Sequence, residues 1–325
     1  MKRRSILRGA ALGLLVLAGP MAGGAEVMAQ DSFPSKTIEI VNLSGAGGGS
    51  DIFLRMAALR ARKSLKTDIQ VLPKPGGLGV NAMNYVNGKP RDGYTVMSLL
   101  PGHLISIANG KAPIGFDELV PLVRGTDDPQ LLMVAGNGSF TGITDVIAEA
   151  KRRPIKIGGT HVGGIDHITA VSFIKKVGAQ NPIYIPFKSG SELVTNLIGG
   201  NIEVAVLNFG EAESQIESGE IQAAVVLAKD RMSVLPDTPT SHDAGFDLNI
   251  SLVRGMAVLK GTPEDRIAAL ETAFLKSMNH SVYQNYLSGS GLAPSSIADR
   301  QAWSAQISDM YVSIQDTLKE LGMAQ

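Results

Sequence analysis

Short apolar runs alternate with helical stretches along most of the chain. Residues 37–43 form one such run, and apolar side chains then recur every three or four positions up to Leu65, which is the spacing of one helix face. Further apolar runs lie at 69–72, 94–99, 119–123, 131–134, 155–158, 183–185, 204–207, 221–227 and 252–259. Strands that alternate with helices in this way predict parallel, doubly wound α/β sheets.

Helical spacing and capping residues predict the helices between these runs. Thr144 and Thr262 are each expected to cap a helix. Pro263 is expected at the first position of the second of these helices, where Pro is favoured. The predicted helices are 80–86, 144–151, 165–177, 191–198, 211–217, one that starts after Thr262, and a long amphipathic helix at 299–321.

A glycine-rich turn separates the first apolar run from its helix. It reads Ser-Gly-Ala-Gly-Gly-Gly-Ser-Asp and spans residues 44–51. Glycine lets backbone N–H groups approach a bound group closely, and the start of a helix carries unpaired donors and partial positive charge. We therefore predict an anion site over this turn, with Ser50 or Asp51 as the helix cap. A turn whose glycines serve only packing is the alternative.

The second half of the chain repeats this arrangement, with a strand, a glycine-rich turn at 159–164 and a helix. Ligands of open α/β sheets bind beyond the carboxyl ends of the strands, where both turns and the loop 100–103 are expected. We therefore predict two similar α/β lobes that close on a small ligand by hinge motion. The expected division is a signal segment at 1–30, a first domain from 31–136 and 253–325, and a second domain at 137–252.

The first 30 residues have the layout of a secretory signal peptide. Lys2 and three arginines up to Arg8 precede an apolar core at 10–18, and Ala29 offers a small residue for cleavage. The arginine pair is also typical of the twin-arginine route, so both the Sec and the twin-arginine route stay open. With no cysteine for a lipid anchor, we expect a soluble periplasmic protein.

Composition removes several classes of function. The 325 residues include no cysteine, which excludes disulfides, a thiol nucleophile and zinc sites of the cysteine type. Four of the 30 basic and one of the 30 acidic residues fall in the signal segment, so the mature chain carries a net charge of −3. Such a chain lacks the basic footprint of a nucleic-acid-binding protein. We expect a monomer without a nucleic-acid partner.

Several short motifs follow one another along nearly the whole mature chain. The most specific is Asp92-Gly93-Tyr94-Thr95, and the others lie at 33–41, 47–51, 75–79, 204–208, 235–245 and 261–263. Each motif alone carries little information, but their order and spacing are specific. Together they resemble the periplasmic solute-binding proteins of tripartite tricarboxylate transporters, also called the Bug family.

The resemblance implies a two-lobed fold of the periplasmic-binding-protein type, a type II Venus flytrap in which each lobe is a doubly wound, mainly parallel sheet. It also implies a small carboxylate ligand, with dicarboxylates and aromatic carboxylates favoured, and permease subunits of a tripartite transporter as partners. In this family, backbone amides and small hydroxyl groups hold the ligand, often through water. Neither a catalytic residue nor a cofactor is expected.

Carried over to this chain, the resemblance places the ligand between loops of both lobes. We expect Asp51 and Asp166 to cap their helices without touching the anion, because a carboxylate would repel an anionic ligand. The predicted ligand-binding residues are Ser44, Gly47, Gly48, Gly49, Ser50 and Asp51 on the first wall, Leu100, Gly102 and His103 in the middle, and Gly159, Thr160, His161, Gly163, Gly164, Ile165 and Asn208 on the second wall.

Two features depart from the family pattern. The loop at 99–103 replaces a loop that is usually rich in Ser and Thr, and His161 stands where small residues are more usual. A protonated His103 beside a carboxylate would add a charge-assisted hydrogen bond. His161, Asp166 and His167 suit no standard zinc spacing, so we expect no metal, and we expect His167 to pack or hydrogen-bond in the first turn of its helix.

Two other functions compete with transport. A secreted dinucleotide-binding enzyme would need a third glycine or alanine where Ser50 stands and an acid at the end of the second strand, where Pro73 and Lys74 follow Leu72. No Gly-x-Ser-x-Gly motif supports a hydrolase. A binding protein that serves a signalling receptor would use the same cleft, so the sequence does not separate sensing from transport.

Overall fold

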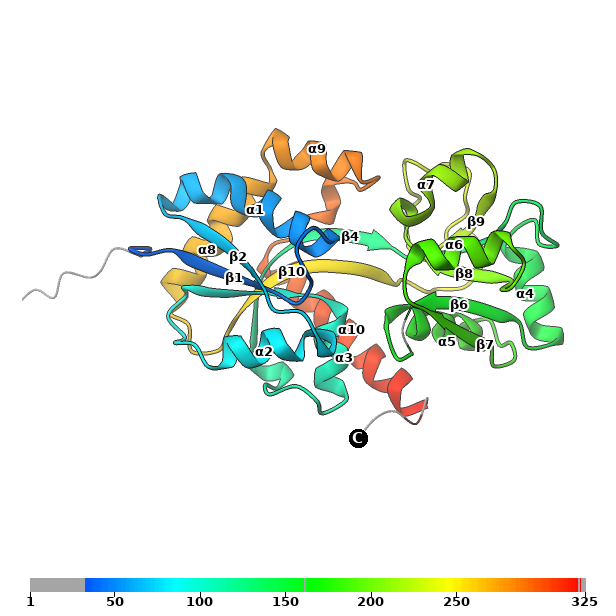
Figure 1. Cartoon of the computed structure of the whole chain (residues 1–325), viewed down its shortest axis with the longest axis horizontal. Helices are drawn as coiled ribbons and strands as arrows, with labels where there is room; N and C mark the ends of the chain where they lie inside the picture. The colour runs from blue at the N-terminus through cyan, green and yellow to red at the C-terminus, as the bar shows by residue number, and fades with distance from the viewer. Residues whose placement is uncertain (1–32, 161, 321, 323–325) are drawn as a thin grey trace, which may run out of the picture. The chain divides into compact units, whose positions relative to one another are not determined.

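A computed structural model of the chain describes residues 33–160, 162–320 and 322. The predicted signal segment and His161 lie outside the described residues. The described strands form two five-stranded mixed sheets with helices packed on them (Figure 1). The predicted α/β class is therefore confirmed. None of the described helices is long and apolar enough to cross a membrane.

The first sheet takes its strands from both ends of the mature chain. They are β1 (Ile38–Asn42), β2 (Ile69–Pro73), β3 (Thr95–Leu99), β4 (Leu119–Pro129) and β10 (Ser251–Leu259). The order across the sheet is β2-β1-β3-β10-β4. β1 pairs in parallel with β2 and β3, whereas β10 runs antiparallel to β3 and β4.

Helices cover both faces of this sheet. On one face pack α1 (Gly49–Leu65), α8 (Glu264–Met278) and α9 (Ser281–Gly289), and on the other pack α2 (Val80–Asn87), α3 (Pro101–Ala108) and α10 (Arg300–Glu320). Ile38 and Ile40 join the core beneath α1, while Val41 joins the core beneath α2. Successive strand residues point to opposite faces, so one apolar strand supplies both cores.

Gly255 of β10 is required by the packing of α10. Trp303 of α10 is fully buried, and a Cβ at position 255 would lie 2.5 Å from its ring. We expect Gly255→Ala to lower the free energy of unfolding by roughly 1–3 kcal/mol through overpacking, as measured by chemical denaturation. Gly210→Ala is the control, because a Cβ there meets nothing within 4 Å. Equal stability of the Gly255→Ala and wild-type proteins would contradict this packing.

The second sheet is built from the middle of the chain. Its order is β7 (Ile183–Phe187), β6 (Lys156–Thr160), β8 (Val204–Leu207), β5 (Leu131–Ala135) and β9 (Ile221–Val226). α4 (Ile143–Arg152) and α5 (Ile165–Lys176) pack on one face, and α6 (Gly190–Ile198) and α7 (Phe209–Glu217) pack on the other. The strand at 131–135, which the predicted boundary at 136 assigns to the first domain, pairs in this sheet; the domain division itself stays a prediction.

The carboxyl ends of the parallel strands in the two sheets face each other. β4 continues through Gln130 into β5, so it points toward the second sheet, and β1 and β3 run in the same direction as β4 (Figure 1). β8 is antiparallel to β5, and β6 and β7 run with β8 back toward the first sheet. The loops that follow β1, β3, β6 and β8 therefore lie on facing edges, as the sequence predicts.

Several predicted helix starts are wrong by one or two residues. α1 begins at Gly49 with Gly48 as its cap and no side-chain hydrogen bond, so neither Ser50 nor Asp51 caps it. α4 is capped by Gly142 and not by Thr144, and α8 is capped by Pro263 and not by Thr262. Three single-turn helices, at Gly77–Gly79, Phe116–Glu118 and Pro294–Ser296, were not predicted.

Candidate functional site

The loop between β1 and α1 is held in shape by its own polar side chains. Asn42, which is fully buried, accepts hydrogen bonds from the Ser44 amide at 3.2 Å and from the Ser50 hydroxyl at 2.6 Å. Gly47 adopts φ +81°, a conformation that favours glycine. Because these side chains bond back into the loop, the backbone of the glycine run is fixed in place before a ligand arrives.

Asp51 serves the loop and does not project from it. Its carboxylate accepts the Gly47 amide at 3.0 Å and the Arg55 guanidinium at 2.8 and 3.1 Å. The hydrogen bond from Arg55 holds the pKa of the Asp51 carboxyl below its usual value. The first amides of α1, at Gly49 and the two following residues, have no carbonyl acceptor within the helix. The arrangement thus presents N–H donors while its one carboxylate is neutralised.

The middle loop contains a buried, neutral histidine. His103 is fully buried, and its Nδ1 accepts the Leu100 amide at 3.2 Å. Burial lowers the pKa of the imidazole to about 4. The ring packs against Gly79, where a Cβ would lie 2.5 Å from it. Burial therefore favours the neutral ring in the protein without ligand, where His103 joins α3 to the turn before α2. Its contact with a ligand carboxylate stays a prediction.

In the loop between β6 and α5, as in the first loop, an aspartate accepts a hydrogen bond from a loop amide. The Asp166 carboxylate accepts the Thr160 amide at 2.8 Å and the Thr160 hydroxyl at 2.6 Å. The Gly163 amide, at φ +74°, donates to His167 Nδ1 at 3.0 Å, which is the predicted role of this histidine in the first turn. Burial lowers the pKa of His167, and its ring stacks on Tyr184. His161 lies outside the described residues.

Glycine at 159 is also required by close packing. A Cβ there would lie 2.5 Å from the Tyr184 hydroxyl and 2.6 Å from the Asp166 Cβ. The Tyr184 hydroxyl itself donates to the Thr160 carbonyl at 2.6 Å. Val162, in contrast, is 56% exposed on the same loop. The loop therefore combines hydrogen bonds at Thr160 and Gly163 with an exposed apolar side chain at Val162.

Asn208 ties the second sheet to the crossing between the sheets. Its Nδ2 donates to the carbonyls of Asp128 and Pro129 at 2.9 and 3.0 Å, and its Oδ1 accepts from Gln130 at 3.0 Å. The backbone amide of Asn208 donates to the Glu211 carboxylate at 2.9 Å. Because the polar atoms of this side chain are already bonded within the protein, Asn208 positions the loop after β8.

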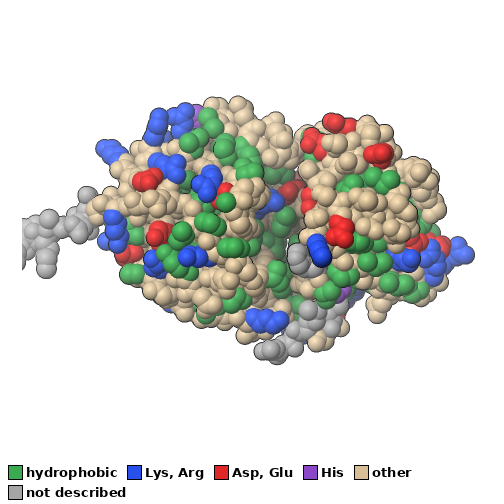
Figure 2. All heavy atoms as spheres, viewed as in Figure 1, with side chains coloured by type: hydrophobic (Ala, Val, Ile, Leu, Met, Phe, Trp, Pro, Cys, Tyr) green, Lys and Arg blue, Asp and Glu red, His purple; other side chains and the backbone are tan. Residues whose placement is uncertain are grey.

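Arg254 of β10 is the main feature that the sequence reasoning missed. Its side chain is 15% exposed, and its Nη1 lies 3.4 Å from the Thr126 hydroxyl and 3.7 Å from the Asp128 carboxylate. Its Nη2 would lie 3.4 Å from a Cβ at Gly49, so the guanidinium sits beside the start of α1. The available signal was a single charge within the apolar run 252–259. Figure 2 shows basic and acidic side chains together in the hollow between the two halves.

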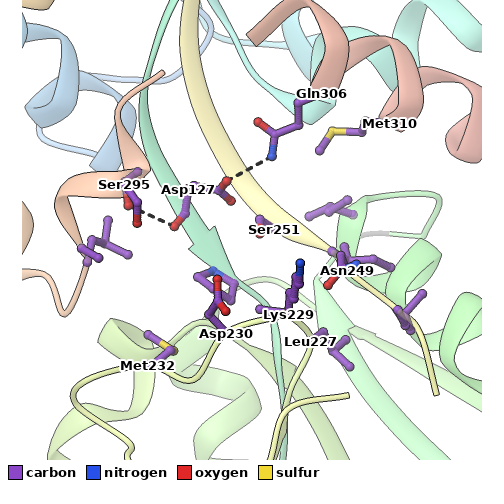
Figure 3. Close-up of a pocket in the computed structure, with 18 of the residues that line it drawn as sticks. Asp127, Leu227, Lys229, Asp230, Met232, Asn249, Ser251, Ser295, Gln306 and Met310 are labelled. Carbon is purple, nitrogen blue, oxygen red and sulfur yellow. Dashed lines mark hydrogen bonds between the residues drawn. The ribbon is translucent and has the colours of Figure 1, made fainter. Parts of the chain in front are cut away.

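A cavity of about 880 Å³ lies apart from these loops, beside the ends of β4 and β10 that connect the two sheets. Its wall includes Asp127, Lys229, Asn249 and Gln306, and the Gln306 amide donates to the Asp127 carboxylate at 3.1 Å (Figure 3). Of the predicted ligand-binding residues, only Ile165 lines it. The loops that carry the predicted anion site and this cavity are therefore two different places.

Comparison with protein families gives one match over most of the chain. Residues 53–323 match a family described as the tripartite tricarboxylate transporter family receptor. A UPF0065 protein of Bordetella pertussis is 26% identical over 99% of this chain and 97% of its own length. The protein BugT of the same organism is 25% identical over 69% of this chain and 71% of its own length.

Solved structures share the same fold. A TctC solute-binding protein from Polaromonas is 25% identical, with a TM-score of 0.80 over 89% of this chain and 99% of that one. MatC from Rhodopseudomonas palustris, solved with bound malate, is 21% identical, with a TM-score of 0.69 over 88% of this chain and 100% of that one. A second R. palustris protein, solved with adipate, is 21% identical, with a TM-score of 0.72 over 90% and 99%.

Proposed function

Because the chain belongs to the tripartite tricarboxylate transporter receptor family, we propose that it captures a small carboxylate in the periplasm and presents it to a membrane permease. The observation that carries this proposal is the position of two glycine-rich loops on facing sheet edges. In each loop an aspartate, Asp51 or Asp166, turns back onto its own backbone. The remaining amides and hydroxyls are then the groups that meet the ligand.

In the proposed complex, a ligand carboxylate lies over the first loop. The amides of Gly48, Gly49 and Ser50 donate to its oxygens, and the start of α1 adds favourable electrostatics. The Gly159–Gly164 loop closes from the second half, with the exposed Val162 and the neighbouring Ile165 against the carbon frame of the ligand. Closure by hinge motion about the two chain segments that connect the sheets, one between β4 and β5 and one leading into β10, excludes water and strengthens these hydrogen bonds.

A dicarboxylate is the ligand class that we favour. The solved relatives with malate and with adipate hold diacids of different length in the same fold. We propose that Leu100, Val162, Ile165 and Phe209 provide the apolar surface against the carbon frame of the ligand. Aromatic carboxylates are the second class, and the same experiment separates the two.

A thermal-shift panel on the mature protein, residues 31–325, tests the proposal. The panel holds mono-, di- and tricarboxylates, aromatic acids, amino acids, inorganic phosphate and NAD. We expect a carboxylate at a hundred times its dissociation constant to stabilise the folded protein by about 2.7 kcal/mol, because it binds only the folded state. A shift with phosphate or NAD and with no carboxylate would overturn the proposal.

A further inference from the structure

We propose that Arg254 binds the second carboxylate of a dicarboxylate ligand and makes the site selective for diacids over monoacids. This inference rests on the proposed function and adds the residue that sets the ligand class. A single chemical fact lies behind it: a guanidinium offers five N–H donors in a planar fork that matches a carboxylate.

Position is the first argument. Arg254 lies on β10, between β3 and β4, and its guanidinium reaches the start of α1 beside Gly49. Its Nη1 also lies 3.7 Å from the carboxylate of Asp128, whose backbone carbonyl accepts a hydrogen bond from Asn208 of the second half at 2.9 Å. Arg254 is therefore at the base of the space between the two halves, next to the loop that we propose for the first carboxylate.

Unused hydrogen-bonding capacity is the second argument, and the chain supplies its own comparison. Arg124 is 11% exposed and is fully engaged: it donates to the carbonyls of Ser295 and Ser296 at 2.9 and 2.8 Å, pairs with Asp127 at 2.6 Å and bonds Gln306. Arg254 is buried nearly as deeply, at 15%. Its polar contacts within the described residues are long: Nη1 lies 3.4 Å from the Thr126 hydroxyl and 3.7 Å from the Asp128 carboxylate.

Burial of a guanidinium is costly unless its donors are paired. Asp128 offers only partial compensation, since the charged atoms are 3.7 Å apart. The other titratable groups near Arg254 are Glu211 and the hydroxyls of Tyr283 and Tyr286, and both hydroxyls are neutral because burial raises their pKa values above 10. A ligand carboxylate in bidentate contact would supply the missing acceptors. Asp128 then competes with the ligand carboxylate for the Arg254 guanidinium.

Matched ligands and variants test the proposal by isothermal titration calorimetry. Succinate and butyrate have four carbons each and differ by one carboxylate, and adipate and hexanoate form a second such pair. We expect the wild-type protein to bind the diacid of a pair at least tenfold more tightly. Arg254→Gln should lower diacid affinity at least tenfold and change monoacid affinity less than twofold.

Arg91→Gln is the control variant, because Arg91 pairs with Glu118 and bonds the Lys260 carbonyl. It removes the same charge outside the proposed site and should leave both affinities unchanged. Equal loss of diacid and monoacid binding in Arg254→Gln, or no loss of either, would overturn the proposal.

If Arg254→Gln fails to fold, two other measurements decide. Asp128→Asn keeps the Arg254 guanidinium and removes the carboxylate that competes with the ligand, so it should raise diacid affinity and leave monoacid affinity unchanged. Wild-type protein that binds the two members of each pair equally would also overturn the role of Arg254. That result would leave carboxylate capture itself intact, whereas the absence of any carboxylate binding would overturn the proposed function.

Discussion

Gly48→Val should abolish ligand binding while the protein still folds. Gly48 has φ −75° and ψ 164°, an extended conformation that any residue adopts, and a Cβ there would lie no closer than 3.7 Å to the Gly45 carbonyl oxygen. The fold therefore tolerates a side chain. The valine would, however, cover the first amides of α1, where the ligand carboxylate is proposed to lie. We expect a loss of affinity of at least a hundredfold.

Calorimetry with the best ligand of the panel measures this loss, and a melting curve shows that the variant folds. Gly142→Val is the matched control, because Gly142 caps α4 in extended conformation, and a Cβ there meets nothing within 4 Å. Gly142→Val also replaces a glycine that caps a helix. This cap, however, follows β5, whose carboxyl end points away from the first sheet. Wild-type affinity in Gly48→Val would mean that the loop is not the binding cradle.

The sequence predicts the layout of this fold because the layout depends on local pattern. Apolar runs of four to eight residues, separated by helical spacing, are enough to indicate an α/β protein, and the two glycine turns mark facing strand ends. The order of strands depends on contacts far apart in the chain, as when β10 inserts between β3 and β4. No local pattern of β10 encodes that pairing.

Helix α9 was missed for a related reason. It spans Ser281–Gly289, and only Tyr283 and Leu287 within it are buried. Two apolar contacts four residues apart give too little periodic signal to separate a helix from a loop. The cap, His280, accepts the Val282 amide through its ring, and histidine is not among the residues that usually mark a helix start.

The charges of the site could be predicted only in part. Asp51 and Asp166 were expected to cap their helices, because a carboxylate would repel an anion. The caps are instead Gly48 and Gly164, and both carboxylates bond amides of the preceding loop. The pKa of His103 depends on the burial of its ring against Gly79, at the start of α2, and the sequence does not reveal this contact. Arg254 gave a visible sign, one charge in an apolar strand, but its significance depends on Gly49 and Asp128, which are distant in sequence.

Asp128→Asn should make the protein more stable at neutral pH. The Asp128 side chain is 15% exposed, and burial raises its pKa from 3.8 to about 6, although Arg254 partly opposes the rise. A raised carboxyl pKa means that the folded state holds the proton more tightly than the unfolded state. The stability from this group is therefore complete below pH 3.8 and is lost as the pH rises through about 6.

The size of this loss follows from the pKa difference. At pH 7.5, ionised Asp128 costs about 3 kcal/mol relative to the unfolded chain, because each pKa unit corresponds to about 1.4 kcal/mol. Urea denaturation of the wild type and of Asp128→Asn at pH 4 and pH 7.5 measures it. We expect the variant to gain about 2–3 kcal/mol at pH 7.5 and almost nothing at pH 4.

Asp145→Asn provides a control of opposite sign. Hydrogen bonds from the Thr141 hydroxyl and amide hold the pKa of Asp145 below its usual value, so its charge favours folding at neutral pH, and its removal should lower stability there. If Asp128→Asn were no more stable than the wild type at pH 7.5, then Asp128 would not carry an uncompensated buried charge.

A carboxylate that opposes folding at neutral pH needs another reason to be present, and its neighbours supply one. Asp128 faces Arg254 of β10, Asp127 of its own strand and Glu211 of α7, and burial raises the pKa of Glu211 as well. In the free protein Asp128 keeps the guanidinium beside the start of α1; in the complex it competes with the ligand. The ratio of wild-type to Asp128→Asn affinity for a diacid should therefore rise as the pH falls through 6. The ratio cancels the protonation of the ligand, which lowers the affinity of both proteins at pH 5. Calorimetric titrations with succinate at pH 5 and pH 7.5 compare the two, and an unchanged pH dependence in the variant would assign it to another group.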